Sequence, residues 1–421
     1  MLSTQGPESR LPKETAPGVG MRSLPGRFWQ FAGAYAATAL ADGVRLAALP
    51  LLAASLTHRP LLVALVAVGE SLPWLVVGLP SGVLVDRHDR KQVVQVAAVV
   101  REVVMLVLIA VLLLHRDSVA LLVGLAFLLG CADTFSANAQ VGLVRGLVRP
   151  EQMEAANSVV GGVNAIGTSL VGPALGSLLF AVGILLPFGT DLAAVGLALL
   201  LLLPLTGDFR AAAAVQTEPS AWREMRAGLV WLWQHHTLRT LALLVAASNL
   251  GYGMLFSILV LFVLEVMRLP AAAYGPLLAS LAVGALGGAL LGGRYGVRWR
   301  TPLGLAAILL AQGLTLAALA IFPIVPVAVA GFILGGLGAG IWDVVVDSYR
   351  QRVVPDAVLG RVTSGFHAIG LGAAPVGALL GGALASSLGL RAPVLAGAAI
   401  SIAAAAATWL SLSCGDLAVP A

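Results

Sequence analysis

The chain has 421 residues, of which 59% are hydrophobic and only 11% are charged, and its formal net charge is +5. Soluble globular domains carry roughly 25% charged residues, so a water-facing surface cannot be built from so few charges and much of this surface must face lipid. The basic residues are scattered between apolar runs, which argues against a nucleic-acid partner. The two cysteines, Cys131 and Cys414, have neither a metal-ligand spacing nor a disulfide framework.

The N-terminal segment is polar and rich in proline and glycine. No short apolar stretch follows its charges at the distance typical of a cleavable signal peptide. We therefore expect residues 1–26 to form a disordered cytoplasmic tail, with a second short tail at residues 414–421.

Twelve apolar runs follow, each long enough to cross a bilayer as a helix of about 20 residues. They are divided by charge clusters and by proline or glycine turns, and they fall near Phe28–Leu56, Leu61–Val83, Val93–Leu114, Val119–Val141, Asn157–Gly183, Leu185–Leu205, Leu238–Leu264, Ala271–Gly293, Pro302–Phe322, Ile324–Asp347, Val362–Leu388 and Ala392–Leu412. A transmembrane barrel would need alternating strands of roughly 10 residues, and these runs do not alternate. The sequence predicts an all-α membrane protein.

The distribution of lysine and arginine predicts which loops face the cytoplasm. If the N-terminal tail and every second loop are cytoplasmic, nineteen of the 25 basic residues fall on that side and four on the other. The remaining two, Arg45 and Arg101, lie within helices. We therefore expect both termini in the cytoplasm.

The chain also reads as two related halves. The longest polar stretch between spans, residues 207–237, separates six helices from six, so we predict bundles at 27–206 and 238–413 joined by a cytoplasmic central loop. Two basic loops resemble each other, with Pro150-Glu151 in one and Pro355-Asp356 in the other, and each leads into a helix that carries Ala-Ile-Gly. Duplicated six-helix halves are typical of secondary transporters.

The strongest motif stands between the second and third predicted helices. It runs Gly-Val-Leu-Val-Asp-Arg-His-Asp-Arg-Lys, and it resembles the loop motif of the major facilitator superfamily at Gly82, Asp86, Arg87, Arg90 and Lys91. Asp89 stands where that family has a glycine, so the turn there is expected to differ. The resemblance implies that these residues, together with Arg101 in the next helix, belong to a cytoplasmic gate between the halves. The alternative is a positively charged anchor that only fixes the topology.

Further segments resemble one bacterial branch of that superfamily. They are Ala41-Asp42-Gly43 with the Ala-Leu-Pro-Leu-Leu that follows, and the stretch from Arg350 to Arg361. This branch includes enterobactin-type siderophore exporters and macrolide efflux pumps. The resemblance implies the major facilitator fold, a monomer in the bacterial inner membrane, and export of bulky organic molecules, driven by a proton gradient with no bound cofactor.

The fifth predicted helix resembles, in weakened form, a motif of drug/proton antiporters. The matching residues are Gly167, Gly172, Pro173 and Gly176. Small residues allow two membrane helices to approach closely, and proline bends a span. Ordinary helix packing therefore explains the pattern as well as an antiport role does.

Ionisable groups within spans are expensive to bury and are taken as functional candidates. In the family, helices 1, 4, 7 and 10 line a central cavity, and we expect a cavity wall or proton-coupling site built from Asp42, Arg45, Glu70, Asp133, Asn249, Tyr252, Trp342 and Asp343. Asp42 is the first candidate for proton coupling, with Arg45 three residues away on the same helical face. The alternative is a static ion pair, either Asp42 with Arg45 or Arg101 with Glu102.

No nucleotide-binding loop, metal-ligand cluster or nucleophile-base arrangement stands out, so we expect neither an enzyme nor a metal site. The sequence favours a proton-coupled exporter whose partners are a small-molecule substrate, protons and lipid. An importer, a dedicated siderophore exporter and a non-transporting receptor remain as alternatives.

Overall fold

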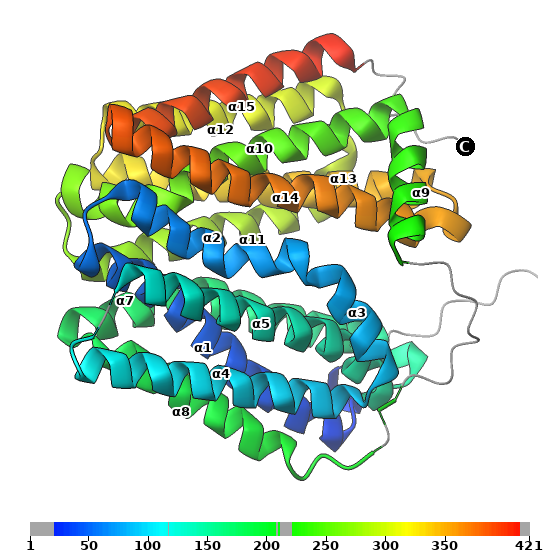
Figure 1. The fold of residues 1–421 in the computed structure, drawn as a ribbon. Coiled ribbons are helices and arrows are strands. Elements are labelled where there is room, and N and C mark those ends of the chain that lie inside the picture. Colours follow the sequence, from blue (N-terminus) through cyan, green and yellow to red (C-terminus); the bar gives the residue numbers. More distant parts are fainter. Residues whose placement is uncertain (1–20, 117, 208, 211–220, 413–421) are drawn as a thin grey trace, which may run out of the picture.

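A computed structural model describes residues 21–116, 118–207, 209–210 and 221–412, and the regular secondary structure of these ranges is helical (Figure 1). The predicted tails, 1–26 and 414–421, lie mostly or wholly outside the described residues, as does Cys414. Eleven helices in the described part are long and apolar enough to cross a membrane. Helices suit the bilayer because each satisfies its own backbone hydrogen bonds.

The remaining span, which is the second along the chain, is interrupted. Helix α2 (Pro60–Val76) has only 17 residues, and α3 (Gly78–Arg87) continues it beyond Val77. The break at Val77 precedes Pro80, which has no backbone N–H to donate to the carbonyl of Val76 and so interrupts the helical hydrogen bonds there. The two helices together form the second predicted span, so the twelve-helix prediction is confirmed.

The remaining spans agree with the predicted runs to within a few residues at most ends. Their bounds are α1 (Gly26–Leu56), α4 (Arg90–Leu113), α5 (Val119–Leu147), α6 (Met153–Asn164) continued by a π-helical turn (Ala165–Val171) and α7 (Gly172–Val182), α8 (Leu185–Leu202), α10 (His236–Leu261) continued by a π-helical turn (Phe262–Val266), α11 (Tyr274–Trp299), α12 (Pro302–Ile321), α13 (Val325–Val353), α14 (Asp356–Leu388) and α15 (Arg391–Ser411).

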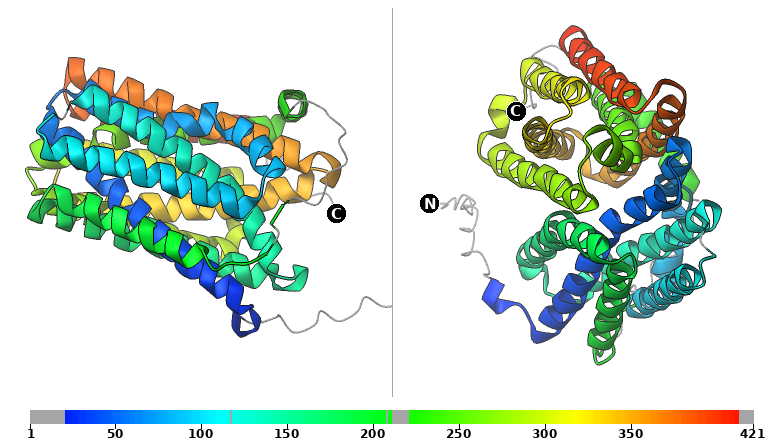
Figure 2. Two further views of the ribbon diagram at one scale, coloured as in Figure 1. Left: turned by 60° about the horizontal axis from the view of Figure 1, so that its bottom comes forward. Right: turned by 90° about the vertical axis from the view of Figure 1, so that its left-hand side faces the viewer.

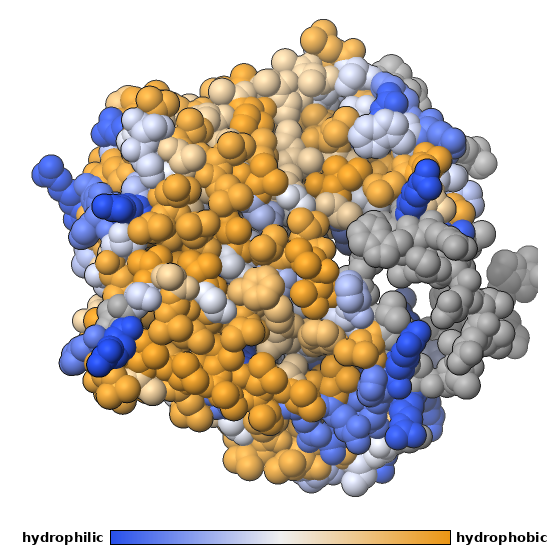
Figure 3. All heavy atoms as spheres, viewed as in Figure 1, coloured by the Kyte–Doolittle hydropathy of each residue, from blue (hydrophilic) through white to orange (hydrophobic). Residues whose placement is uncertain are grey.

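These helices form two bundles that lie side by side. Seen along the helices, the bundle of α1–α8 (the N-half) and that of α10–α15 (the C-half) are separate groups, and α2 lies against α14 where they meet (Figure 2). On the face seen in Figure 3, apolar side chains cover most of the surface between the two ends. This distribution is the one that a bilayer requires.

The central stretch 207–237, expected to be a polar loop, contains a helix. Helix α9 (Ala221–Gln234) lies across the spans at one end of the C-half and packs on α14 (Figure 1). Its Leu232 is fully buried in the C-half core. Charges and Gly228 mask this short amphipathic pattern when the segment is read only for hydropathy.

The two ends of the bundle differ in charge and in contact between the halves. The connections α3–α4, α5–α6, α11–α12 and α13–α14 lie at one end, here called the basic end because the following arginines lie in or next to them: Arg87, Arg90, Arg145, Arg149, Arg298, Arg300, Arg350 and Arg352. At the opposite end the halves touch: the amide of Leu61 donates to Ser386 Oγ at 3.1 Å, and His58 Nδ1 lies 2.9 Å from Glu265 Oε1. Toward the basic end the surface is hollowed between the halves (Figure 3).

Glycines bring the fifth span close to α1. A side chain at Gly172 would strike the backbone at Gly43, and one at Gly176 would strike Val44. Gly167 lies similarly against Ala39. The helix-5 motif therefore forms a packing surface for α1, and Pro173, which also lies against Gly275 of the C-half, ends the π-helical turn.

Candidate functional site

A cavity of about 920 Å³ lies between the halves. Its lining comes from α1, α2, α4, α5, the fifth span and α8 of the N-half and from α10, α11, α13 and α14 of the C-half. A pocket of this size holds a drug-sized molecule. Because the halves touch at the opposite end, the cavity is closed there, and it is the natural place for a substrate.

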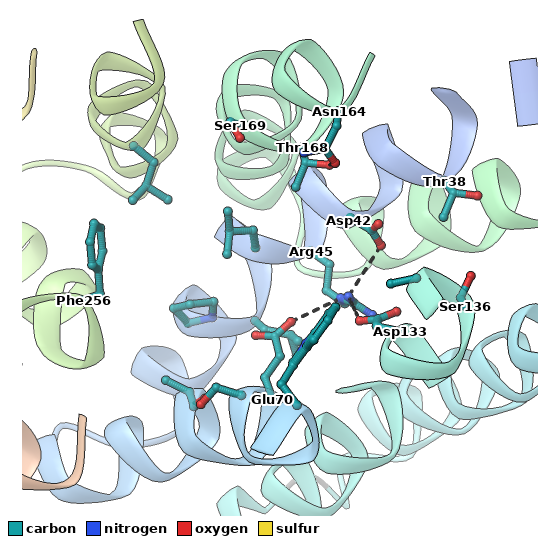
Figure 4. A pocket seen from close by; sticks show the side chains of 18 of the residues that line it. Thr38, Asp42, Arg45, Glu70, Asp133, Ser136, Asn164, Thr168, Ser169 and Phe256 are labelled. Atoms are coloured by element: carbon teal, nitrogen blue, oxygen red, sulfur yellow. Dashed lines mark hydrogen bonds and ion pairs between the residues drawn. The ribbon is translucent and has the colours of Figure 1, made fainter. Parts of the chain in front are cut away.

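Arg45 of α1 stands at the centre of a group of carboxylates in this cavity (Figure 4). Its guanidinium pairs with Asp133 of α5, and it lies 3.5 Å from Glu70 of α2 and 3.6 Å from Asp42 one turn away on α1. The arginine side chain is 4% exposed, whereas the three carboxylates are 20–31% exposed. The carboxylates therefore face the cavity, and the arginine lies behind them.

Arg101 of α4 forms the second centre of the same network. Its guanidinium pairs with Asp42, lies 3.6 Å from Asp133 and donates to Asp191 of α8 at 2.7 Å. Asp191 is 1% exposed and does not line the cavity. Arg101 is thus held from the protein side by Asp191 and from the cavity side by Asp42.

The network joins two guanidiniums to four carboxylates: Asp42, Glu70, Asp133 and Asp191. With all six groups ionised its net charge is −2. Excess negative charge in an apolar cavity is unfavourable unless protons or other cations neutralise it. A proton or a cationic group near these carboxylates would reduce that excess negative charge.

Neutral polar groups surround the network on the N-half side. Thr38, Ser136, Thr168 and Ser169 line the cavity near the charges (Figure 4). Asn164 receives a hydrogen bond from Tyr35 Oη at 3.3 Å. These hydroxyls and amides offer hydrogen bonds to a bound molecule or to water without adding charge.

The C-half wall is aromatic and aliphatic. Tyr252 and Phe256 of α10 stack with ring centroids 5.7 Å apart and face the network across the cavity, and Tyr274, Leu278 and Leu281 continue the same surface. No charged side chain of the described C-half lines the cavity. This wall suits the apolar body of an organic molecule.

The predicted cavity residues divide into two groups. Asp42, Arg45, Glu70, Asp133, Asn249 and Tyr252 all line the cavity, with Asn249 Nδ2 bound to the carbonyl of Gly370 at 2.9 Å. Trp342 and Asp343 of α13 do not. Trp342 is buried in the C-half core, and Asp343 is exposed one turn beyond Ala339, the lining residue on its helical face. Helix rotation and depth, which the sequence does not give, separate these two residues from the cavity.

Asp191 and Arg101 were not among the cavity residues predicted from the sequence. Asp191 is a single carboxylate inside an apolar run, which is the pattern that could have identified it. Arg101, which the sequence analysis groups with the gating residues, lines the cavity and pairs with Asp42. The ion pairs of Arg101 go to three other helices and do not include its neighbour Glu102.

The loop motif at residues 82–91 holds the basic end of the N-half together. Arg90 lies against Gly142 of α5, donating to its carbonyl at 3.4 Å. Lys91 Nζ donates to the carbonyls of Leu203 and Leu205 at 3.0 and 2.8 Å, where it stabilises the end of α8. Gly82 lies within α3 and Arg87 is exposed in its last turn; the side chain of Asp86 lies outside what the structure describes.

Asp89, which replaces the family's glycine, has a clear local role. Its carboxylate accepts the amides of Lys91 and Gln92 at 2.9 and 3.2 Å and so caps α4. Its φ of −65° is open to any residue, so the turn needs no glycine here. The same carboxylate accepts the amide of Phe209 at 3.4 Å, which ties the start of the central stretch to the N-half.

Among the described residues, no cluster of three or more histidine, cysteine or acidic side chains has a geometry that could hold a metal ion.

The sequence matches known transporters. The family model of the Major Facilitator Superfamily matches residues 31–365. A relative, the multidrug efflux pump Tap of Mycolicibacterium fortuitum, is 28% identical over 374 residues, which cover 84% of this chain and 88% of that pump.

Solved transporters share the fold. A mutant of the nucleoside transporter NupG aligns with a TM-score of 0.75 at 10% identity, covering 92% of this chain and 100% of that one. A bacterial homologue of the iron transporter ferroportin in an inward-facing state aligns with a TM-score of 0.70 at 19% identity, covering 92% and 99%. With the family match over most of its length and with this architecture, the chain belongs to the Major Facilitator Superfamily and is a multi-pass membrane transporter.

Proposed function

We propose that the chain exports bulky, neutral or cationic organic compounds from the bacterial cytoplasm by alternating access, in exchange for protons. The observation that carries this proposal is the set of contacts between Arg45 and the three carboxylates Asp42, Glu70 and Asp133 inside the cavity. Burying charges within membrane spans costs free energy, so charges that face a cavity there are best explained by a role in transport.

The basic end is the cytoplasmic end in this proposal. Nineteen lysine and arginine residues on that side against four on the other satisfy the positive-inside rule for the inner membrane. The halves touch at the opposite end, so this conformation is the one that accepts substrate from the cytoplasm. Rocking of the two bundles about the cavity would open the other end.

Proton exchange follows from the charge count of the network. Four carboxylates face two guanidiniums, so a cationic substrate and protons neutralise the same excess charge. Protons that enter from the outside neutralise the carboxylates. A cationic substrate then loses its partners and is released. A neutral substrate would be exported by the same cycle if proton binding to these carboxylates changed which end of the cavity is open.

The chemistry of the two walls supports the substrate class. A positive group would lie against the N-half carboxylates, and an apolar body would lie on Tyr252 and Phe256. Aromatic faces also attract cations. The relative named a multidrug efflux pump is in line with a broad range of such compounds.

The alternatives fit the cavity less well. An anionic siderophore needs a cationic partner, and the two arginines that line the cavity are both already bound by carboxylates. An importer would use the same fold, and only the direction of flux separates it from an exporter. A receptor without transport has no need of a charged network in the path between the halves.

Asp42→Asn tests the proposal. In proteoliposomes with an imposed pH gradient, the native chain should move tetraphenylphosphonium, a lipophilic cation, against protons, and the variant should lose this coupled flux while remaining folded and inserted. Asp343→Asn, which removes an exposed carboxylate outside the cavity lining, is the matched control. Undiminished substrate-driven proton flux in Asp42→Asn would refute the role of this carboxylate.

Direction and substrate class need a second measurement. Cells that lack or overproduce the chain should differ in susceptibility to macrolides, tetracyclines and lipophilic cations, and not in secretion of catechol siderophores. Increased accumulation of the compounds on overproduction would instead identify an importer.

A further inference from the structure

The helix α9 in the central stretch has one face that the protein covers and one that it leaves open. Gly228 lies so close to α14 that a side chain there would strike the backbone of Arg361, and Leu229 lies against Gly365. On the opposite side Arg226, Val230 and Trp233 are exposed, with exposed fractions of 50% for Val230 and 51% for Trp233. The spacing of these three residues places them on one helical face.

The depth of α9 follows from its crossing point on α14. Arg361 and Gly365 precede Leu388, the last residue of α14, by 27 and 23 residues. At 1.5 Å per residue α9 lies about 35–40 Å from that end. The hydrocarbon core of a bilayer is about 30 Å thick, so a core that begins near Leu388 ends about 5–10 Å before α9. This distance corresponds to the headgroup layer.

The direction of α9 suits that layer. The helix lies across the spans and therefore parallel to the membrane plane (Figure 1). Tryptophan is enriched at the headgroup level, and arginine there pairs with anionic lipids while its carbon stem lies on apolar groups. Gln234, about 100° around the helix from Trp233, gives the neighbouring exposed edge a polar side chain that faces water.

We propose that the face formed by Arg226, Val230 and Trp233 binds the headgroup layer of an anionic leaflet. The occupant is lipid and not a protein, because the face lies at headgroup depth beside the bundle and combines the positive charge of Arg226 with an apolar edge. Bound in this way, α9 anchors the C-half end of the connection between the bundles to the membrane surface. The inference holds for any substrate or direction of transport.

Spin labels on the full-length chain test this. In a background with Cys131→Ser and Cys414→Ser, a label at Trp233→Cys should be more accessible to oxygen than to a water-soluble nickel complex, and one at the neighbouring Gln234→Cys should show the reverse. A third label, at Val230→Cys, reports the docked and undocked states in nanodiscs of phosphatidylcholine with or without phosphatidylglycerol. The docked fraction should rise with phosphatidylglycerol.

Arg226→Gln should lower the docked-to-undocked ratio about fivefold in the anionic nanodiscs, the value expected for one charge near such a surface. Arg27→Gln, which removes an exposed arginine near the start of α1, is the control and should leave the ratio unchanged. The proposal would be overturned if labels at 233 and 234 were equally accessible to the nickel complex. It would also be overturned if the docked-to-undocked ratio did not change with phosphatidylglycerol.

Discussion

The N-half and the C-half place the same helical positions along the cavity but give them different chemistry. In α1 the lining residues Asp42, Arg45, Leu46, Leu49 and Pro50 recur about 207 residues later in α10 as Asn249, Tyr252, Gly253, Phe256 and Ser257. The backbone pattern of the duplication is preserved, whereas the ion pair has become an amide and a phenol. One wall therefore carries the charges that can exchange protons, and the other carries the surface that can bind an apolar molecule.

The difference also concerns how each half tolerates polar groups. The N-half buries Arg45, Arg101 and Asp191, each of which has an oppositely charged partner within 4 Å. A charge buried in this way requires its partner, since a lone charge in an apolar interior is strongly unfavourable. The described C-half lining has no charged side chain and therefore carries no such requirement.

The largest effect is expected at Arg101. Arg101→Leu should lower the free energy of unfolding by about 3–5 kcal/mol, because Asp191 is left buried without its cation. The double variant Arg101→Leu with Asp191→Leu should recover much of this loss, since both charges are then replaced by apolar groups as in the C-half. Thermal unfolding in nanodiscs measures both. If the double variant is less stable than the single one, the pairing explanation is wrong.

A smaller effect is expected at the glycine contact that holds α1 in place. Gly172→Ala should lower stability by about 1–3 kcal/mol, because the new methyl group meets the backbone of Gly43, which cannot move aside without shifting α1. Gly161→Ala on the same span adds its methyl group to open space and should have little effect. Melting temperatures of the two variants, measured side by side, distinguish close packing from a general effect of replacing glycine.

If the N-half wall couples transport to protons and the C-half wall binds the apolar body, one variant should affect only proton coupling and another only substrate affinity. Phe256→Ala should raise the KM for a bulky neutral substrate about tenfold through loss of apolar contact, with proton coupling retained. Asp133→Asn should instead abolish the dependence on the pH gradient and leave binding of the neutral substrate nearly unchanged. Counterflow measures substrate affinity and gradient-driven uptake measures proton coupling, and both should be recorded for both variants. Loss of coupling in Phe256→Ala would contradict the distinction between the walls.

The smallest effect is expected where the halves meet at the opposite end. His58 and Glu265 are 84% and 39% exposed, and such surface ion pairs contribute about 0.2–1 kcal/mol. The contact joins the two halves across the closed end, so its loss should favour opening there. Glu265→Gln should therefore slightly raise the fraction of molecules that are open at this end. The alkylation rate of Ser136→Cys in the cavity by an impermeant reagent reports which end is open.

Much of the fold could be predicted from the sequence because the bilayer acts locally along the chain. Each span must be apolar over about 20 residues, and this requirement is visible without knowing any neighbour. The central stretch was harder, because α9 is stabilised by burial of Leu232 and Gly228 against α14 and not by hydropathy of its own. The role of Asp89 as a helix cap likewise depends on the positions of two amides.

For the site, the sequence alone shows that ionisable groups such as Asp42, Arg45 and Glu70 stand in membrane spans, where the cost of burying them marks them as functional candidates. Their partners follow only from the packing of the folded chain. Arg101 binds Asp42 and Asp191 from two other helices, while Trp342 and Asp343 lie outside the cavity lining. The reason is that helix rotation, depth and tilt set which side chains meet, and these depend on the packing of all twelve spans together.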